Sequence, residues 1–419
     1  MDKRIKAKLA TKERRHNMSC KVFELKIDKS HLSYKTLNHL TKLFIEAKWF
    51  YNFCLGSPEL SEVDTKVRKV PVKVKEVFET RSLTVLSSQM KQSILQSIFD
   101  NLKGLKASKT KGRKVGALNF KSEEHSVPLK QYGVTYDIDG NRIRIQGLMP
   151  WLRVNGTEQI PEGAEIANAN LINEAGDFWF HVTCYVPPDS KLTELNKGKV
   201  TGSDSGCTNQ LTLSQGIKVQ FEVPPSKKQK KLDRDSSIPK KEKHSKNRKK
   251  ALVKRQKEFL HQNNQKKDIK NKVVHIITTN FEIVITQKEN VKGWQKGGHG
   301  KKVHNTGIGG LTSALQKKAH TPVIVDRFYP STQICSQCGH RQKKKVELWD
   351  RTFICEDCKC TLERDWNSSM DMEVEGLRML NIPTERRDCS TFKPAENETS
   401  IHLCEEFNKI PHVRASFVR

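Results

Sequence analysis

The chain has 419 residues with 76 Lys and Arg against 47 Asp and Glu, a formal net charge of +29. This length predicts two to four domains, and 35% hydrophobic residues suffice for packed cores, which excludes a disordered tail. No apolar run approaches the ~20 residues of a spanning helix and the basic start lacks an apolar signal core, so we expect no membrane segment and a reducing, intracellular compartment. The excess of positive charge predicts a polyanionic partner, for which nucleic acid is the first candidate.

The N-terminal half predicts a helical region followed by a β-rich one. Apolar residues recur at helical spacing between about 31 and 105. From about 115 to 190 the pattern changes to short alternating runs, with turns at 139–141 and around Gly176. We expect an antiparallel β module here, and a strand at 20–27 that joins the same sheet despite the helical insertion.

Residues 200–223 predict a strand, a small-residue turn and a hairpin, after which the composition becomes strongly basic. Between Ser226 and Lys257 there are fifteen Lys or Arg against three Asp or Glu, a net +12. The first half predicts a loop, and a long basic helix is expected from about Lys246 towards Lys272. We interpret this segment as a phosphate-contacting surface rather than a merely solvated one. The residues assigned to it are Lys227, Lys228, Lys230, Lys231, Arg248, Lys249, Lys250, Lys254 and Arg255.

Two features follow the basic segment. The apolar run 281–286 predicts a buried strand. The glycine-rich stretch 293–302 predicts a mobile loop.

Five of the eleven cysteines cluster between Cys335 and Cys360, which favours one metal site over a disulfide framework. Cys335-x2-Cys338 and Cys355-x2-Cys358 are two knuckles on either side of a short intervening hairpin, the spacing of a four-thiolate zinc ribbon. Each knuckle turns two sulfurs towards one ion, and binding replaces the core that so small a module lacks. We predict a closed, structural zinc site with these four ligands and Cys360 as a spare thiol.

The residues around the ribbon resemble a known family. The run RFYPSTQICSQCG at 327–339 and the run ERDWNSS at 363–369 resemble the ribbon and following segment of the transposon-encoded TnpB proteins, relatives of the compact type V CRISPR effectors. Upstream, KWFYNFCL at 48–55, GSDSG at 202–206 and NVKG at 290–293 are similar to stretches that the family carries in the same order. The resemblance covers most of the chain to about residue 380.

This resemblance implies an α+β multidomain fold, in which a β-barrel-like wedge domain with a helical recognition insertion precedes a RuvC domain. The RuvC domain would be of RNase H-like α/β fold, with the zinc ribbon inserted before its last segment. The implied boundaries are 1–30 for a wedge strand and the basic N-terminus, 31–110 for the helical recognition domain, 111–195 for the wedge β domain, 196–329 for RuvC with the basic helix, 330–362 for the zinc ribbon, 363–385 for the last RuvC segment and 386–419 for a tail.

The resemblance also implies an RNA-guided DNA endonuclease, whose partners are a guide RNA and a target double-stranded DNA with a short flanking motif. Its cofactors would be structural Zn2+ and catalytic Mg2+, and its place the prokaryotic cytoplasm or nucleoid. Whether one copy or a homodimer serves each guide stays open. Two alternatives are an RNA-guided DNA-binding repressor that does not cleave, and a zinc-ribbon nucleic-acid protein without a guide.

By the match, Asp204 and Asp365 are two of three carboxylates that would hold Mg2+ in a two-metal site. The third is missing, because Gln287 stands where the family has Glu, shortly before NVKG. Glutamine offers one neutral oxygen, so metal affinity and cleavage should fall while guide and target binding survive. Three explanations stay open: an engineered inactive nuclease, a naturally inactive RNA-guided DNA-binding protein, or replacement of the carboxylate by Glu289 or Glu282.

Overall fold

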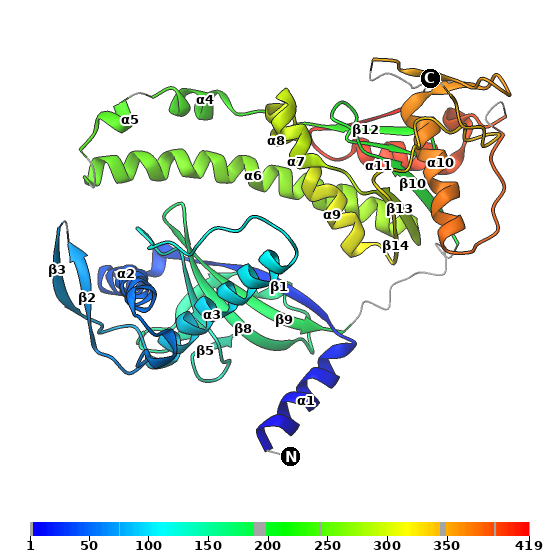
Figure 1. Ribbon diagram of the computed structural model, residues 1–419. Coiled ribbons are helices and arrows are strands. Elements are labelled where there is room, and N and C mark those ends of the chain that lie inside the picture. The colour runs from blue at the N-terminus through cyan, green and yellow to red at the C-terminus, as the bar shows by residue number, and fades with distance from the viewer. Residues whose placement is uncertain are drawn as a thin grey trace. The chain divides into compact units, whose positions relative to one another are not determined.

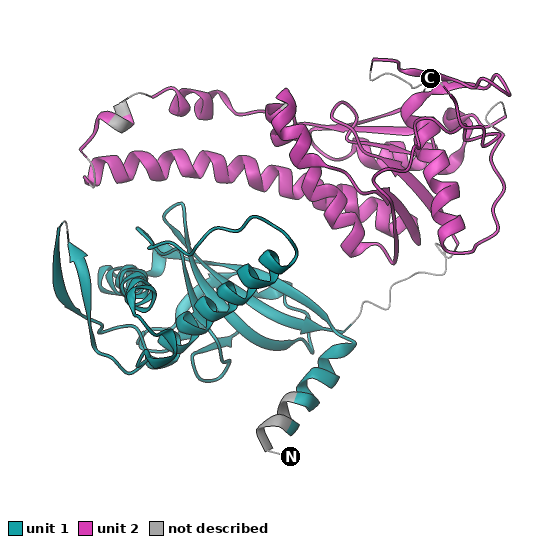
Figure 2. Ribbon diagram, viewed as in Figure 1, with its two compact units in different colours: residues 1–189 teal, residues 190–419 magenta. Residues whose placement is uncertain are grey.

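The computed structural model describes residues 3–74, 76–187, 198–235, 237–242, 245–343, 349–388 and 391–418. Its mixed α+β chain divides into two compact units, unit 1 (residues 1–189) and unit 2 (residues 190–419), as Figure 2 shows. None of the described helices combines the length and apolar character that a membrane crossing requires.

Unit 1 contains a seven-stranded antiparallel sheet in the order β4-β8-β9-β1-β7-β6-β5, which curls into a nearly closed barrel (Figure 1). β1 pairs with β9 on one side and with β7 on the other, as expected for the 20–27 segment. The strands are β1 (Ser19–Ile27), β4 (Ser126–Leu129), β5 (Tyr136–Asp139), β6 (Arg142–Ile145), β7 (Leu152–Asn155), β8 (Glu165–Glu174) and β9 (Asp177–Val186).

Three helices accompany this sheet: α1 (Lys3–His16), α2 (Tyr34–Gly56) and α3 (Ser88–Thr110). α2 and α3 share one hydrophobic core with the sheet, and the rings of Phe44 and Phe178 stack with their centroids 5.8 Å apart. The expectation of helix throughout 31–105 is wrong between them, where β2 (Lys69–Val74) and β3 (Val77–Ser82) form a hairpin. Alternating β-branched residues and Pro71 favour a strand there, since proline interrupts a helix.

The sheet of unit 2 has six strands in the order β14-β13-β10-β11-β12-β17. β10, β13 and β14 are parallel, whereas β11, β12 and β17 extend the sheet in antiparallel pairing. Asp204 and Gln287 therefore end neighbouring parallel strands at the same edge. The strands are β10 (Val200–Asp204), β11 (Leu211–Leu213), β12 (Ile217–Phe221), β13 (Ile283–Gln287), β14 (Thr321–Val325) and β17 (Val413–Phe417).

Helices cover both faces of this sheet. α6 (Lys246–Asn280), α9 (Ile308–Lys318) and α11 (Glu398–Asn408) share a core with one face, where Val284 points. α10 (Arg364–Met379) lies on the other face, where Ile285 points. The approach is close, because a Cβ built on Gly202 of β10 would lie 2.1 Å from the Ser369 carbonyl oxygen. Only glycine at this position lets α10 contact the strand that carries Asp204.

Two loop expectations of the sequence are wrong. The segment 293–302 is helical, with α7 (Val291–Trp294), a π-helical turn (Gln295–His299) and α8 (Gly300–Thr306) joined at a kink, where Gly298 has φ 88°. The basic segment contains the short helices α4 (Lys227–Asp233) and α5 (Ser237–Lys240). The small hairpin β15 (Thr352–Ile354) and β16 (Thr361–Glu363) precedes α10.

Candidate functional site

The four predicted zinc ligands lie together in unit 2. The Sγ atoms of Cys335, Cys338, Cys355 and Cys358 are all within 4.8 Å of one another. The distances are 3.7 Å from Cys335 to Cys358 and 3.6 Å from Cys338 to Cys355. A tetrahedron with Zn–S bonds of about 2.3 Å has edges of about 3.8 Å, so the cluster fits a zinc ion. Cys360 lies outside the four-cysteine group among the described residues and packs half-buried beside it.

The first knuckle is attached directly to α10. Asn367, which is fully buried, donates from Nδ2 to the Ile334 carbonyl oxygen at 2.7 Å. Its Oδ1 accepts from the Ser336 backbone N–H at 2.9 Å. The amide thus replaces two backbone hydrogen bonds that the tight knuckle cannot make by itself. The Asn of the RDWN sequence therefore has a structural role, to join the ribbon to α10.

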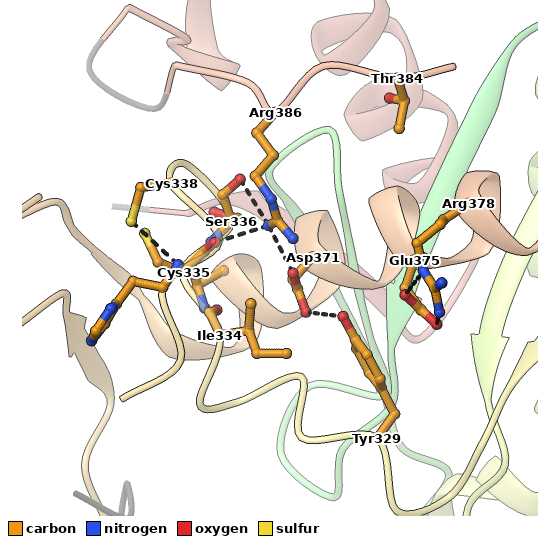
Figure 3. A network of polar contacts seen from close by, with 12 residues as sticks. Tyr329, Ile334, Cys335, Ser336, Cys338, Asp371, Glu375, Arg378, Thr384 and Arg386 are labelled. Atoms are coloured by element: carbon orange, nitrogen blue, oxygen red, sulfur yellow. Dashed lines mark hydrogen bonds and ion pairs between the residues drawn. The ribbon is translucent and has the colours of Figure 1, made fainter. Parts of the chain in front are cut away.

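A second contact to the knuckle comes from residues after α10 (Figure 3). Arg386 donates from Nη1 to the Cys335 carbonyl oxygen and to Asp371 Oδ1, both at 2.9 Å. Asp371 is fully buried on α10, and its Oδ2 accepts from the Tyr329 hydroxyl at 2.8 Å. Burial raises the pKa of Asp371 to about 6, although Arg386 and Tyr329 act to lower it. One guanidinium therefore joins the knuckle to the helix that begins with Arg364 and Asp365.

The carboxylates predicted by the resemblance also meet in unit 2. Asp204 ends β10 and Asp365 lies in the first turn of α10. Burial raises the pKa of Asp204 well above its usual value, and the negative charges of Asp365 and then Glu289 raise it further. Arg364 offsets part of this repulsion, since its Nη2 donates to Asp365 Oδ1 at 2.8 Å. Three carboxylates thus concentrate negative charge at the edge of the sheet.

Gln287 does not share in this concentration of charge. Its Nε2 donates to the carbonyl oxygens of Asp326 at 3.1 Å and Tyr329 at 3.0 Å. Its Oε1 accepts from the Ser331 hydroxyl at 3.4 Å. A glutamate cannot donate to two carbonyl oxygens, so the amide is suited to holding the loop 326–331.

The two proposed replacements for the missing carboxylate are placed differently. Burial raises the pKa of Glu289, whereas the charge of Arg327 lowers it. Glu282 lies at the start of β13, where its Oε2 accepts from the Gly198 backbone N–H at 2.6 Å. Glu289 therefore lies near Asp204, whereas Glu282 lies at the opposite end of β13. The sequence signal for Glu289 is only its position just after Gln287.

The nine basic residues assigned to nucleic acid lie on α4 and α6, which run alongside each other (Figure 1). Two of them also join the two helices, because Lys228 of α4 pairs with Glu258 of α6 and Arg255 Nε of α6 donates to Asp233 Oδ1 of α4 at 3.1 Å. A third, Arg248 of α6, donates from Nη1 to the Lys241 carbonyl oxygen just after α5 at 3.1 Å. The exposed remainder comprises Lys227, Lys230, Lys231, Lys249, Lys250 and Lys254.

Replacing Lys249, Lys250 and Lys254 together by glutamine is expected to weaken nucleic-acid binding. Each phosphate contact contributes a slope of about 0.7 to 0.9 in log K against log salt, so the slope should fall by about 2 to 3. Lys272→Gln is the control, because its Nζ already pairs with Asp268 of the same helix at 2.8 Å. Filter binding of RNA across a salt series measures the slope for the triple variant and for the control. Equal slopes for these two variants would contradict the assignment of the three lysines to phosphate contacts.

Comparison with known proteins places these features in context. A solved structure described as "Cryo-EM structure of the Cas12f1-sgRNA-target DNA complex" aligns with a TM-score of 0.44 and 12% identity, over 85% of this chain and 99% of that one. The Streptomyces pristinaespiralis protein named "Putative RNA-guided DNA endonuclease" is 26% identical over 234 residues. The match spans 54% of this chain and only 57% of that relative's length.

A family model adds evidence at the ribbon. Residues 310–372 match the family described as "Cas12f1-like, TNB domain", a stretch that contains all four clustered cysteines and reaches into α10. This match and the Streptomyces relative agree with the motifs read from the sequence. The resemblance of this chain to TnpB-like proteins and compact type V effectors is thereby confirmed.

Proposed function

We propose that this protein is an RNA-guided DNA endonuclease of the TnpB and compact type V kind. In this proposal unit 2 is the RuvC domain with its zinc ribbon, and unit 1 is the wedge domain with the helical recognition insertion. The expected boundaries change at the C-terminus, because the segment expected as a tail, 386–419, supplies α11 and β17 to the core and sheet of unit 2. The observation that carries the proposal is the convergence of Asp204 and Asp365, which are distant in the sequence, at the edge of one sheet.

The carboxylate cluster suits Mg2+ as its cofactor. Carboxylate oxygens are the ligands that Mg2+ prefers, and like charges that are half-buried close together are stabilised by a cation between them. Asp204, Asp365 and Glu289 would hold the metal, which supplies stabilisation of negative charge on a phosphodiester in the transition state. Gln287 instead fixes the loop 326–331, which brings Arg327 to Glu289.

Guide and target recognition would use other surfaces. The exposed lysines of α4 and α6 suit phosphate groups of a guide RNA or its heteroduplex with DNA. The Streptomyces relative's name supports an RNA guide and a DNA substrate. Base pairing by the guide would then select the target, and the protein would read only a short flanking motif.

The test is cleavage of a guide-matched DNA by the RNA-loaded protein in Mg2+. We expect cutting by the wild-type chain, and a loss of at least about 100-fold in Asp204→Asn and Glu289→Gln, since each removes a charged metal ligand. Glu282→Gln is the matched control, because this glutamate lies at the far end of β13. Retained cutting in Glu289→Gln would contradict its role as the third carboxylate.

A second candidate, an RNA-guided DNA-binding protein that does not cleave, is favoured by one observation. Gln287 is neutral, and both its Nε2 and its Oε1 form hydrogen bonds with the loop 326–331. Guide-dependent DNA binding without cutting, in both wild type and Gln287→Glu, would establish this candidate. Cutting only by Gln287→Glu would instead mean that Gln287 silences a nuclease. Purification of the chain without any bound RNA, together with no binding of added guide, would overturn both candidates.

A further inference from the structure

The hairpin β2–β3 of unit 1 has one face that no described part of the chain covers. It projects from the rest of its unit (Figure 1). Because directly paired residues of an antiparallel ladder share a face, the pairs Lys69↔Ser82, Pro71↔Thr80 and Lys73↔Phe78 lie on one side of the hairpin. All six side chains are exposed. We call this side the outer face.

The opposite side of the hairpin, which we call the packed side, contacts unit 1 through β2, while its β3 residues Val77, Glu79 and Arg81 are exposed. It carries Val70, which is fully buried, and Val72, which packs half-buried against the core of the unit. The base is fixed as well, because Leu83 N donates to the Arg68 carbonyl oxygen at 2.8 Å and Glu46, fully buried on α2, accepts from Leu86 N at 2.9 Å. The packed side and anchored base hold the outer face in place without a partner.

The outer face has a composition that suits a polyanion. It combines two lysines, two hydroxyl side chains, a proline and an aromatic ring that is 68% exposed, Phe78. It carries no carboxylate. Glu79 lies on the packed side, where it pairs with Arg81, and Glu76 of the turn approaches Lys73 Nζ at 3.6 Å with both side chains more than half exposed. Such an exposed ion pair is weak and yields readily to a phosphate.

We propose that the outer face of β2–β3 is a duplex-DNA contact that enters the major groove. The major groove of B-DNA is about 12 Å wide and admits a two-stranded ribbon, whereas the deep, narrow major groove of A-form RNA does not. Lys69 and Lys73 then contact phosphates or guanine edges. Phe78 makes an apolar contact to a thymine methyl group, a contact that phenylalanine makes in other DNA complexes. The choice of DNA as partner rests on the proposed function, and cleavage plays no part in it.

The test compares variants on the two sides of the hairpin. Phe78→Ala is matched with Val77→Ala, a neighbouring apolar residue that is 65% exposed and lies on the opposite side. The double variant Lys69→Gln/Lys73→Gln on the outer face has Arg81→Gln on the packed side as its control. Affinity of the RNA-loaded protein for guide-matched duplex DNA is measured across a salt series. Affinity for the guide RNA and thermal unfolding are measured separately.

We expect about fivefold weaker DNA binding in Phe78→Ala, which is about 1 kcal/mol. In the double lysine variant the slope of log K against log salt should fall by about 2. Val77→Ala and Arg81→Gln should bind DNA as the wild type does, and all variants should bind the guide equally. DNA affinity that is unchanged in the outer-face variants, while the wild type binds DNA, overturns this inference alone. If the outer-face variants lose affinity for the guide instead, the face contacts RNA and the inference of a DNA contact is also overturned. A wild-type chain that binds no DNA overturns both this inference and the proposed function.

Discussion

Replacing Cys335 by serine is expected to abolish stoichiometric zinc binding and to unfold the ribbon, whose described part comprises residues 330–343 and 349–362. The apolar cluster inside the ribbon is small, consisting of the buried residues Cys335, Phe353 and Cys355. Zinc binding to such modules contributes about 10–16 kcal/mol of folding free energy, far more than this cluster can. Zinc per chain, measured by mass spectrometry, should fall from one to near zero. Hydrogen exchange of β15 and β16 should rise to unprotected rates.

Cys360→Ser is the matched control for this prediction. Cys360 lies close to Cys355 and Cys358 in the sequence but outside the four-thiolate group. Its serine variant should keep one zinc per chain and native exchange rates in the ribbon. Full zinc content in Cys335→Ser, or zinc loss in Cys360→Ser, would show that the ion uses a different ligand set.

The features predictable from the sequence are those that local patterns determine. The spacing of two C-x2-C knuckles is sufficient to identify the cysteine cluster, because each knuckle forms within a few residues. The strand at 20–27 was predictable for a similar reason, since alternation of apolar and polar residues indicates a half-buried strand. The convergence of Asp204 and Asp365 came from the family resemblance, and neither residue has a local signal stronger than a turn or a helix cap.

The features that were missed depend on contacts between distant segments or on a pattern read over too long a window. The hairpin β2–β3 carries an evident alternation of Lys and Val in Lys69–Val74, but the helical periodicity on both sides of it dominated the interpretation. The segment 293–302 is rich in glycine, yet it is helical and leads into α8, where Val303, Asn305 and Thr306 are buried. Arg386 lies beyond the end of the helix that carries Asp371 and no motif surrounds it, so only the fold reveals their contact.

Arg386→Ala is expected to destabilise the junction between the ribbon and α10 by about 3 kcal/mol. Asp371 is fully buried, and removal of its cation leaves an uncompensated charge, which typically costs about 3–5 kcal/mol. We take the lower end because Arg386 itself is 26% exposed. The Cys335 carbonyl oxygen also loses its donor. Faster hydrogen exchange in peptides of α10, and faster zinc release to a chromogenic chelator, would measure this effect.

Arg378→Ala supplies the control on the same helix (Figure 3). Arg378 pairs with Glu375 at 2.7 Å but is 74% exposed, so its loss should cost less than about 1 kcal/mol and leave zinc release unchanged. Adding Asp371→Asn to Arg386→Ala should recover part of the lost protection, because the buried charge is then absent. Equal effects of Arg386→Ala and Arg378→Ala would mean that the buried pair does not couple the ribbon to α10. A coupling confirmed by these variants would explain how zinc, held by a knuckle well before Asp365 in the sequence, positions a carboxylate that it does not touch.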